Sequence, residues 1–172
     1  MTRALTFNQT ELDQTQFAKV ADGYHDTKYF IMGTWGLIGD GFIVYSLTGD
    51  PLAEIKQLTI GNNAKFELSI ENQTIAIARL HITVLNQEFI YLKHENILVT
   101  GNSVTQKYNF FKGRHQITKL ERLDNDATFI REITTDQIET EPTTICIAAM
   151  LGHPRMKISP HHKMNNQVNY GI

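Results

Sequence analysis

The chain has 172 residues, of which 41% are apolar and 20% are charged, and its formal net charge is −2. These values are typical of a globular protein and exclude a long disordered chain. Because the net charge provides no general attraction to nucleic acid, we expect no nucleic-acid partner, and any anion binding requires a local patch. The only cysteine, Cys146, excludes a disulfide framework and favours a reducing compartment.

The first 28 residues contain few structural signals. One positive charge near the start is not followed by an apolar segment, so we expect no signal peptide and a cytoplasmic location. Thr10-Glu11-Leu12-Asp13 is typical of a helix start, and Leu12, Phe17 and Val20 would form its apolar face. This predicts a short helix over residues 10–20, with a first strand as the alternative for the segment.

From Tyr29 onward, short runs of β-branched and aromatic residues alternate with turn residues. The ten predicted strands are residues 29–32, 42–47, 52–58, 65–70, 74–80, 88–93, 97–100, 107–112, 115–123 and 128–134. Strands at this spacing indicate an antiparallel sandwich or barrel. The run Phe42-Ile43-Val44-Tyr45 has no polar position, which predicts a strand that is covered on both faces.

Residues Ile145 to Leu151 form the longest apolar run in the chain. Thr140 as N-cap, Pro142 in the first turn and Gly152 at the end favour a helix over about residues 142–151. The β-branched residues in the run would suit a buried strand instead. A helix of about ten residues is about 15 Å long, which is too short to cross a hydrocarbon core of about 30 Å, so we expect no transmembrane segment.

A helix that is apolar on every side must be enclosed on every side. A closed sheet has no exposed edges, and a wide barrel has an interior that must be filled, so a helix threaded through a barrel satisfies both needs. A helix packed against a sandwich is the alternative. We expect this domain to span residues 29–153, followed by a flexible polar tail over residues 154–172.

Several stretches, taken in order, resemble the LURP-one-related family of the tubby C-terminal-like superfamily. They are residues 38–45, 48–56, 65–68 with 75–79, 99–102, the hairpin carrying Gly113 and Ile117-Thr118-Lys119-Leu120, and the closing apolar run. The resemblance implies a closed antiparallel barrel of about twelve strands around a central hydrophobic C-terminal helix. Two further strands would then lie in the first 28 residues or near residues 83–88. The superfamily includes phosphoinositide-binding tubby domains and proteins called phospholipid scramblases.

Catalytic and metal-binding motifs are present only as fragments. Gly101-Asn102-Ser103-Val104-Thr105 lacks the closing glycine of a nucleophile elbow, and the glycine-rich residues 33–41 are not followed by the Lys-Ser/Thr of a phosphate loop. None of the seven histidines has metal-ligand spacing, and Cys146 is expected to be an inert core residue. Trp35 is expected to be a packed anchor. We therefore expect no enzyme, no cofactor and no metal.

One hairpin concentrates positive charge. Its candidate lipid- or anion-binding residues are Lys107, Lys112, Arg114, Lys119 and Arg122, with His115 and three aromatic residues among them. An ordinary solvated hairpin, partly neutralised by Glu121, is the simpler interpretation, and strand alternation places Lys119 and Arg122 on opposite faces.

The sequence leaves three functional hypotheses open. The first is a non-enzymatic barrel with a binding or regulatory role at anionic lipid headgroups. The second is a protein-interaction or scaffold domain, which an exposed apolar patch and a stable dimer would favour. The third is a lipid-active, scramblase-like protein, which would need a membrane-inserting segment.

Overall fold

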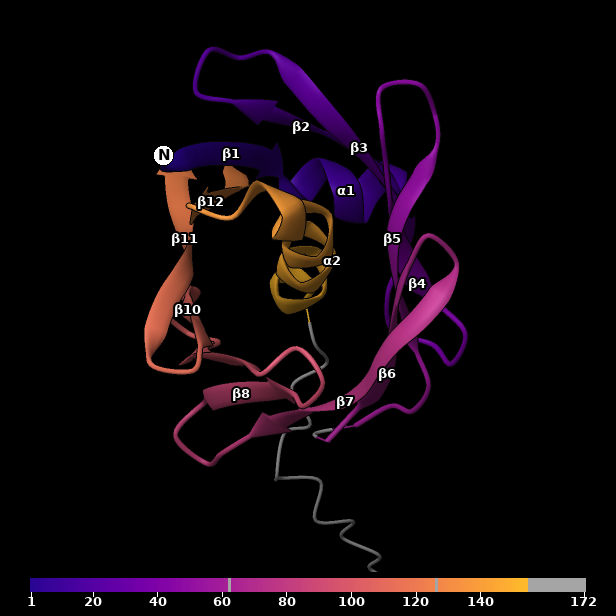
Figure 1. The fold of residues 1–172 in the computed structure, drawn as a ribbon, viewed down its shortest axis with the longest axis vertical. Coiled ribbons are helices and arrows are strands. Elements are labelled where there is room, and N and C mark those ends of the chain that lie inside the picture. The colour runs from indigo at the N-terminus through magenta and orange to yellow at the C-terminus, as the bar shows by residue number, and fades with distance from the viewer. Residues whose placement is uncertain (62, 126, 155–172) are drawn as a thin grey trace, which may run out of the picture.

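The structure, a computed structural model, describes residues 1–61, 63–125 and 127–154, with the backbone alone at Asp124 and Asn125. Twelve antiparallel strands form a closed barrel in which each strand pairs with the next and β1 pairs with β12 (Figure 1). The strands are β1 (Arg3–Asn8), β2 (Phe17–Asp22), β3 (Thr27–Thr34), β4 (Gly41–Tyr45), β5 (Pro51–Gln57), β6 (Lys65–Ile70), β7 (Gln73–Ile82), β8 (Gln87–Leu92), β9 (Ile97–Asn102), β10 (Lys107–Lys112), β11 (His115–Asn125) and β12 (Thr128–Thr135). A mainly β closed barrel with a C-terminal helix inside it is therefore confirmed.

The ten strands predicted after residue 28 are all present, and most of them alternate between buried and more exposed positions. In β7, Ala76, Ala78 and Leu80 are buried, whereas the intervening side chains are exposed. The buried side chains line the inside of the barrel, since successive residues of a strand face opposite sides of the sheet. The alternation therefore determines which side chains enclose the helix.

The N-terminal segment contains both a helix and two strands. The helix α1 (Gln9–Thr15) is capped by Asn8, whose side chain accepts a hydrogen bond from the Glu11 backbone N–H at 3.0 Å. The predicted helix over residues 10–20 was wrong at its end, because Gln16 adopts a left-handed conformation with φ of 60°. The chain then re-enters the sheet as β2, and β1 closes the barrel, which begins at Arg3 rather than at residue 29.

The outer face of β4 also differs from the prediction. Phe42 and Val44 are buried inside the barrel, but Ile43 and Tyr45 on the opposite face are half-buried, and no second layer covers them within the described residues. They line a shallow hollow of about 150 Å³ on the outside of the barrel, together with Pro51 and Glu54. The absence of polar residues in this run thus did not mark a strand covered on both faces.

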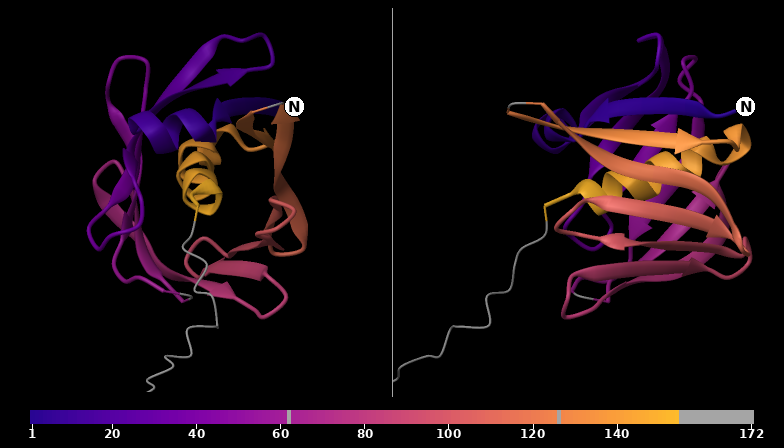
Figure 2. Two further views of the ribbon diagram at one scale, coloured as in Figure 1. Left: turned by 180° about the vertical axis from the view of Figure 1, so that it is seen from behind. Right: turned by 90° about the vertical axis from the view of Figure 1, so that its left-hand side faces the viewer.

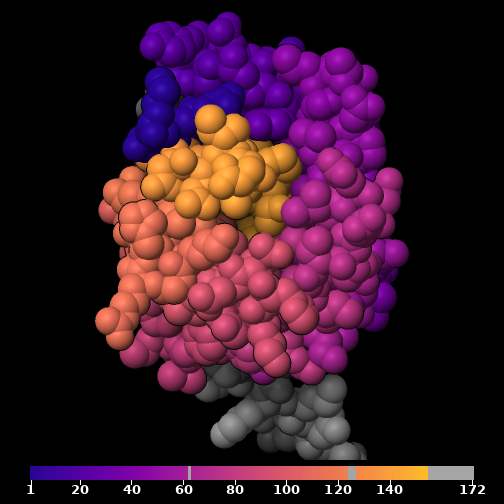
Figure 3. All heavy atoms as spheres, in the orientation of Figure 1, coloured from indigo at the N-terminus to yellow at the C-terminus, as the bar shows by residue number. Residues whose placement is uncertain are grey.

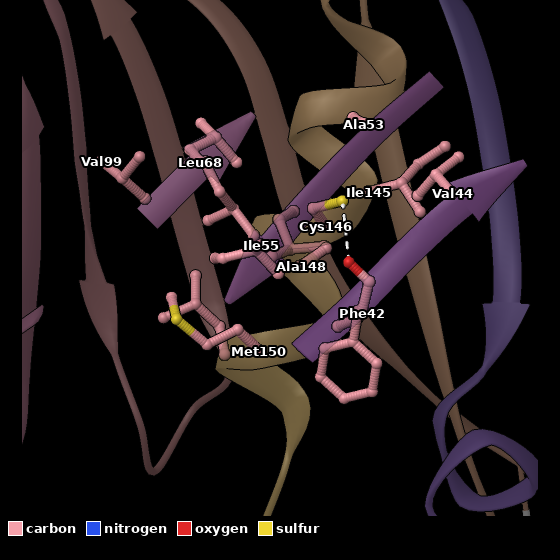
Figure 4. Close-up of a cluster of buried hydrophobic side chains, with 14 of the residues drawn as sticks. Phe42, Val44, Ala53, Ile55, Leu68, Val99, Ile145, Cys146, Ala148 and Met150 are labelled. Carbon is pink, nitrogen blue, oxygen red and sulfur yellow. Dashed lines mark hydrogen bonds between the residues drawn. The ribbon is translucent and has the colours of Figure 1, made fainter. Parts of the chain in front are cut away.

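The helix α2 (Glu141–Gly152) threads the barrel and is preceded by a short 3-10 turn, η1 (Ile138–Thr140). Its side chains from Thr143 to Leu151 are buried, and it runs lengthwise through the barrel (Figure 2). Cys146 lies against β4, with its thiol 3.7 Å from the Phe42 carbonyl oxygen (Figure 4). The predicted helix boundaries are confirmed, including Pro142 in the first turn and the end at Gly152.

Polar contacts fix both ends of α2. At its start, the buried Glu141 carboxylate accepts a hydrogen bond from the Tyr29 hydroxyl at 2.7 Å and lies 3.3 Å from the Arg3 guanidinium. At its end, the Gln9 side chain donates to the Ala149 carbonyl oxygen, and the His153 imidazole lies 3.2 Å from the Asp13 carboxylate. The helix is therefore tied to β1 and β3 at one end and to α1 at the other.

Candidate functional site

The two ends of the barrel carry different loops. Because the strands are antiparallel and follow one another in sequence, the loops after β1, β3, β5, β7, β9 and β11 share one end. Helix α1 lies at that end, which we call the α1 end, and the start of α2 lies at the opposite end (Figure 2). The structure thus separates loops that alternate along the chain into two surfaces.

Exposed apolar side chains gather at the tips of four successive loops at the α1 end. Each of these six side chains is at least 60% exposed, and we call them the apolar rim: Leu37, Ile38, Ile60, Val84, Leu85 and Val104. At the opposite end, the described loops carry three comparable side chains, those of Tyr24, Leu47 and Ile138. Val84, at 99% exposure, contributes nothing to packing in the monomer, and gathered exposed apolar groups are typical of an interaction surface.

Hydrogen bonds between neighbouring loops hold part of the apolar rim in place. The Ser103 backbone N–H donates to the Asn86 carbonyl oxygen at 3.0 Å, and the Asn102 side chain donates to the Leu85 carbonyl oxygen at 3.3 Å. These bonds join the β7–β8 loop, which carries Val84 and Leu85, to the β9–β10 loop, which carries Val104. The three apolar tips on these two loops are therefore presented side by side.

The loop that carries Leu37 and Ile38 is held at its base by a stacked tryptophan and by hydrogen bonds to Gln57. Trp35 is 9% exposed and stacks on Phe42 with 6.1 Å between the ring centroids, which confirms the expected anchor. The Gly36 backbone N–H donates to the Gln57 side chain at 2.9 Å, and the Gly39 N–H donates to the Gln57 carbonyl oxygen at the same distance. The glycine-rich stretch thus carries two exposed apolar residues on a loop fixed at its base.

Two positively charged side chains lie on the outer face of the barrel, on strands next to the loops of the apolar rim. Lys65 begins β6 and faces Arg79 of β7 across the ladder, with both side chains on the outer face of the barrel. Among the described residues, neither has a carboxylate within 4.0 Å. Like charges directly opposite each other destabilise a sheet, so this pair is not explained by the stability of the fold. It provides positive charge beside apolar tips.

The predicted hairpin residues do not form one patch. Lys107 and Lys119 lie on the outer face, where Glu121 pairs with both, at 4.0 and 3.0 Å. Lys112 and Arg114 are exposed around the β10–β11 turn, at the end opposite the apolar rim. No finding tests whether these residues bind an anion, so that role stays a prediction.

Arg122 lies apart from the other hairpin cations. Its guanidinium lies 4.4 Å from the ring centroid of Phe129. Arg122 is also paired in register with the buried Arg131, which places it on the inner face. This agrees with the alternation that set it opposite Lys119.

Sequence reasoning missed a buried arginine. Arg131 is fully buried on the inner face of β12, where its guanidinium lies 5.6 Å from the Tyr108 ring and donates to the Gln106 side chain at 2.8 Å. Its Nε and Nη2 atoms have no hydrogen-bond partner in the described part of the chain. Burial, the largest cause, lowers the pKa of Arg131 to about 10. The pattern Ile130-Arg131-Glu132 gave no signal that the arginine would face inward.

The described residues offer little for catalysis or metal binding. Within the described ranges, no three His, Cys, Asp or Glu side chains lie close enough together to hold a metal ion. Burial raises the pKa of the Cys146 thiol, and the side chain is inaccessible, so it is a core residue as predicted. Across the described part of the chain, no helix combines the length and apolar composition needed to span a bilayer.

Comparisons with known proteins show a shared fold. No family model and no curated protein matches the sequence. Among solved structures, the barrel is similar to the X-ray structure of protein AT5G01750 from Arabidopsis thaliana, with a TM-score of 0.54 and 8% sequence identity. The match covers 88% of this chain and 92% of the Arabidopsis chain. At this identity the likeness establishes a shared architecture alone and leaves the function open.

Proposed function

We propose that this protein is a non-enzymatic binding module that docks its α1 end on an anionic membrane surface. The observation that carries the proposal is the apolar rim, with Lys65 and Arg79 below it. Irregularly spaced apolar tips suit the interfacial region of a bilayer, which needs no matching shape. Positive charge next to them is attracted to anionic lipid headgroups.

The expected binding energy is modest. Full burial of a Val or Leu side chain contributes about 1.5–3 kcal/mol, so Val84 and Leu85 together would contribute about 4 kcal/mol if both entered the interface. A cation near an anionic leaflet adds about 1 kcal/mol. We therefore expect reversible binding that requires anionic lipid and weakens as salt rises.

Co-sedimentation with vesicles tests the proposal. The wild-type protein is mixed with neutral phosphatidylcholine vesicles and with vesicles that also contain phosphatidylserine, at low and at moderate salt. We expect sedimentation with the anionic vesicles only, decreasing with salt. No sedimentation with either composition at low salt would refute the proposal.

Paired variants locate the contact. Val84→Ser combined with Leu85→Ser should lower vesicle binding at least tenfold, because it removes more than about 1.4 kcal/mol of apolar burial. The matched control is Ile77→Ser, which removes a side chain of 63% exposure from the outer face of β7 and should leave binding unchanged. Both sets of positions are exposed, so folding should be preserved.

Charge variants separate the α1 end from the hairpin. Arg79→Gln should lower binding to anionic vesicles, with Lys93→Gln in the β8–β9 turn at the opposite end as its control. If Lys112→Gln and Arg114→Gln lowered binding instead, the opposite end would be the membrane-facing one. A stable dimer in light scattering, together with no vesicle binding, would favour the protein-interaction hypothesis.

A further inference from the structure

The interior of the barrel contains a cavity that α2 does not fill. The helix packs against β4, β5 and β12, so it lies to one side of the barrel. Between α2 and strands β8 to β11 on the other side there is a cavity of about 200 Å³. It lies near the first turns of α2, at the end of the barrel that faces the viewer in Figure 3. This is the end opposite the apolar rim.

The innermost part of the cavity is lined by apolar side chains. Its inner wall is formed by buried side chains from five elements, namely Leu92 of β8, Ile97 of β9, Phe110 of β10, Ile117 of β11 and Ile147 of α2. Side chains of this kind favour contact with an apolar group, and an engineered apolar cavity of about 150 Å³ binds benzene. The depth of the cavity is therefore suited to an alkyl or aromatic group of about six to eight non-hydrogen atoms, by comparison with benzene in the 150 Å³ cavity.

One face of α2 brings hydroxyl groups to the cavity. Thr140, Thr143, Thr144 and Ile147 line it and follow the i, i+3, i+4, i+7 spacing of a single helix face. Thr143 and Thr144 are 8% and 3% exposed. Their hydroxyls make no hydrogen bond within the described residues, and no side chain caps the start of α2. Neither hydroxyl oxygen is among the fully buried atoms that lack a partner, so both are accessible from the cavity and free to bind a ligand there.

The polar part of the lining also contains Lys112, Glu95 and Glu139. None of the three has an ion-pair partner within 4.0 Å among the residues that the structure describes. The Lys112 ammonium and the two threonine hydroxyls can donate hydrogen bonds to a ligand oxygen. The carboxylates of Glu95 and Glu139 oppose an anion that approaches from their side.

We propose that this cavity binds a small amphipathic molecule, with an alkyl or aromatic group among Ile97, Phe110, Ile117 and Ile147 and an oxygen-bearing head at Thr143, Thr144 and Lys112. The ligand class is a short monocarboxylate or alcohol, because the head must accept hydrogen bonds and the space is smaller than a drug-sized pocket of about 300 Å³ or more. The site is independent of the membrane contact proposed for the opposite end.

Titration with three six-carbon probes tests the site. Hexanoate, 1-hexanol and hexylamine share one chain and carry an anionic, a neutral and a cationic head. Isoleucine-methyl NMR of the full chain should show saturable shifts at Ile97, Ile117 and Ile147 with hexanoate and hexanol, and none at Ile77 on the outer face. We expect dissociation constants on the order of 1 mM, from the burial of about five methylenes.

Conservative variants identify the head-group contacts. Thr144→Val keeps the shape of the side chain and should weaken hexanol and hexanoate binding roughly fivefold. Thr100→Val in β9 is the control and should weaken neither. Lys112→Gln should weaken hexanoate binding alone. Because these substitutions preserve volume, an unchanged melting temperature separates lost binding from lost folding.

Several results would overturn the proposal. They are the absence of saturable shifts with hexanoate and hexanol, equal shifts at Ile77, and unchanged affinity in Thr144→Val and Thr143→Val. Tighter binding of hexylamine than of both other probes would overturn the assignment of the head group. Vesicle binding without probe binding, or the reverse, would refute one proposal and leave the other standing.

Discussion

Replacing Ala148 with aspartate places a carboxylate between the central helix and the barrel wall. Ala148 is fully buried, and Figure 4 places it beside Ile55 and Cys146, which offer no cation and no strong hydrogen-bond donor. Burial without a partner raises the pKa of a carboxyl group by about 3–5 units. At about 1.36 kcal/mol per unit, the cost of holding the charged form is about 4–7 kcal/mol. A domain of this size has a free energy of unfolding of about 5–15 kcal/mol, so the variant should be close to unfolded at neutral pH.

The sign of the pH dependence follows from the raised pKa. Between about pH 4 and the raised value, the folded state binds a proton that the unfolded state releases, so stability falls as pH rises through this interval. Urea unfolding followed by circular dichroism at about pH 5 and about pH 8 should therefore show a larger loss at the higher pH. Ala148→Asn has a similar volume without a charge and should lack this dependence. A melting transition for Ala148→Asp equal to that of Ala127→Asp, in an exposed turn, would refute an enclosed central helix.

Three further predictions concern the barrel and its interior. Gly41→Ala should destabilise the protein by about 2–3 kcal/mol in urea unfolding, because a Cβ would lie 2.3 Å from the Ile55 carbonyl oxygen. Gly23→Ala, with nothing within 4 Å of its Cβ, is the control, and equal stabilities of the two variants would contradict the β4–β5 register. Stability should fall as pH rises from about 10 to about 12, because unfolded tyrosines lose their protons near pH 10, whereas burial raises the pKa of Tyr29 and of Tyr108 to about 12. Tyrosinate absorbance should then show two late-titrating groups that ionise together with unfolding, and ionisation of every tyrosine near pH 10 in the folded protein would count against the burial of these two. A thiol reagent should modify Cys146 only as fast as the whole protein unfolds, and rapid modification of the native protein would place α2 outside the barrel.

The spacing of the strands predicted an antiparallel sandwich or barrel, and the need to enclose an apolar helix, together with the family resemblance, favoured the barrel. In β6, Phe66 and Leu68 are buried and Lys65 and Glu67 are partly exposed, as a sheet with one wet face requires. The two ends of α2 were also predictable from local sequence, since Pro142 and Gly152 each favour one end of a helix. Features decided by neighbouring residues in the chain were therefore predictable.

Features decided by contacts distant in sequence were not predictable. Whether Gln16 would adopt a left-handed conformation and return the chain to the sheet depends on the pairing of β2 with β3, so Val20 was assigned to a helix. The Ile43 and Tyr45 side chains stay half-exposed because, in the part of the chain that the structure describes, no second layer lies outside the barrel. The local sequence carries no information about either outcome.

The apolar rim could not be predicted without knowing that the barrel is closed. Its loops are separated along the chain by pairs of strands, and only antiparallel closure gathers them at one end. A local signal did exist, since Val84-Leu85 and Val104 are apolar residues within turn segments rich in Asn, Ser and Thr. The sequence instead pointed to the charged hairpin as a binding site, although Glu121 pairs with two of its lysines. A count of charges along the sequence could not anticipate that pairing.

Insertion of the apolar rim into a bilayer can be measured at a single residue. Because Cys146 is buried and its thiol pKa is raised, a cysteine introduced at position 84 can be labelled selectively with an environment-sensitive fluorophore. Val84→Cys carries the label at the rim, and Leu47→Cys carries it at the opposite end, where Leu47 is 58% exposed. On addition of anionic vesicles, the emission of the label at position 84 should shift to the blue and that at position 47 should not. No shift at position 84, or a larger one at position 47, would contradict membrane docking through the α1 end.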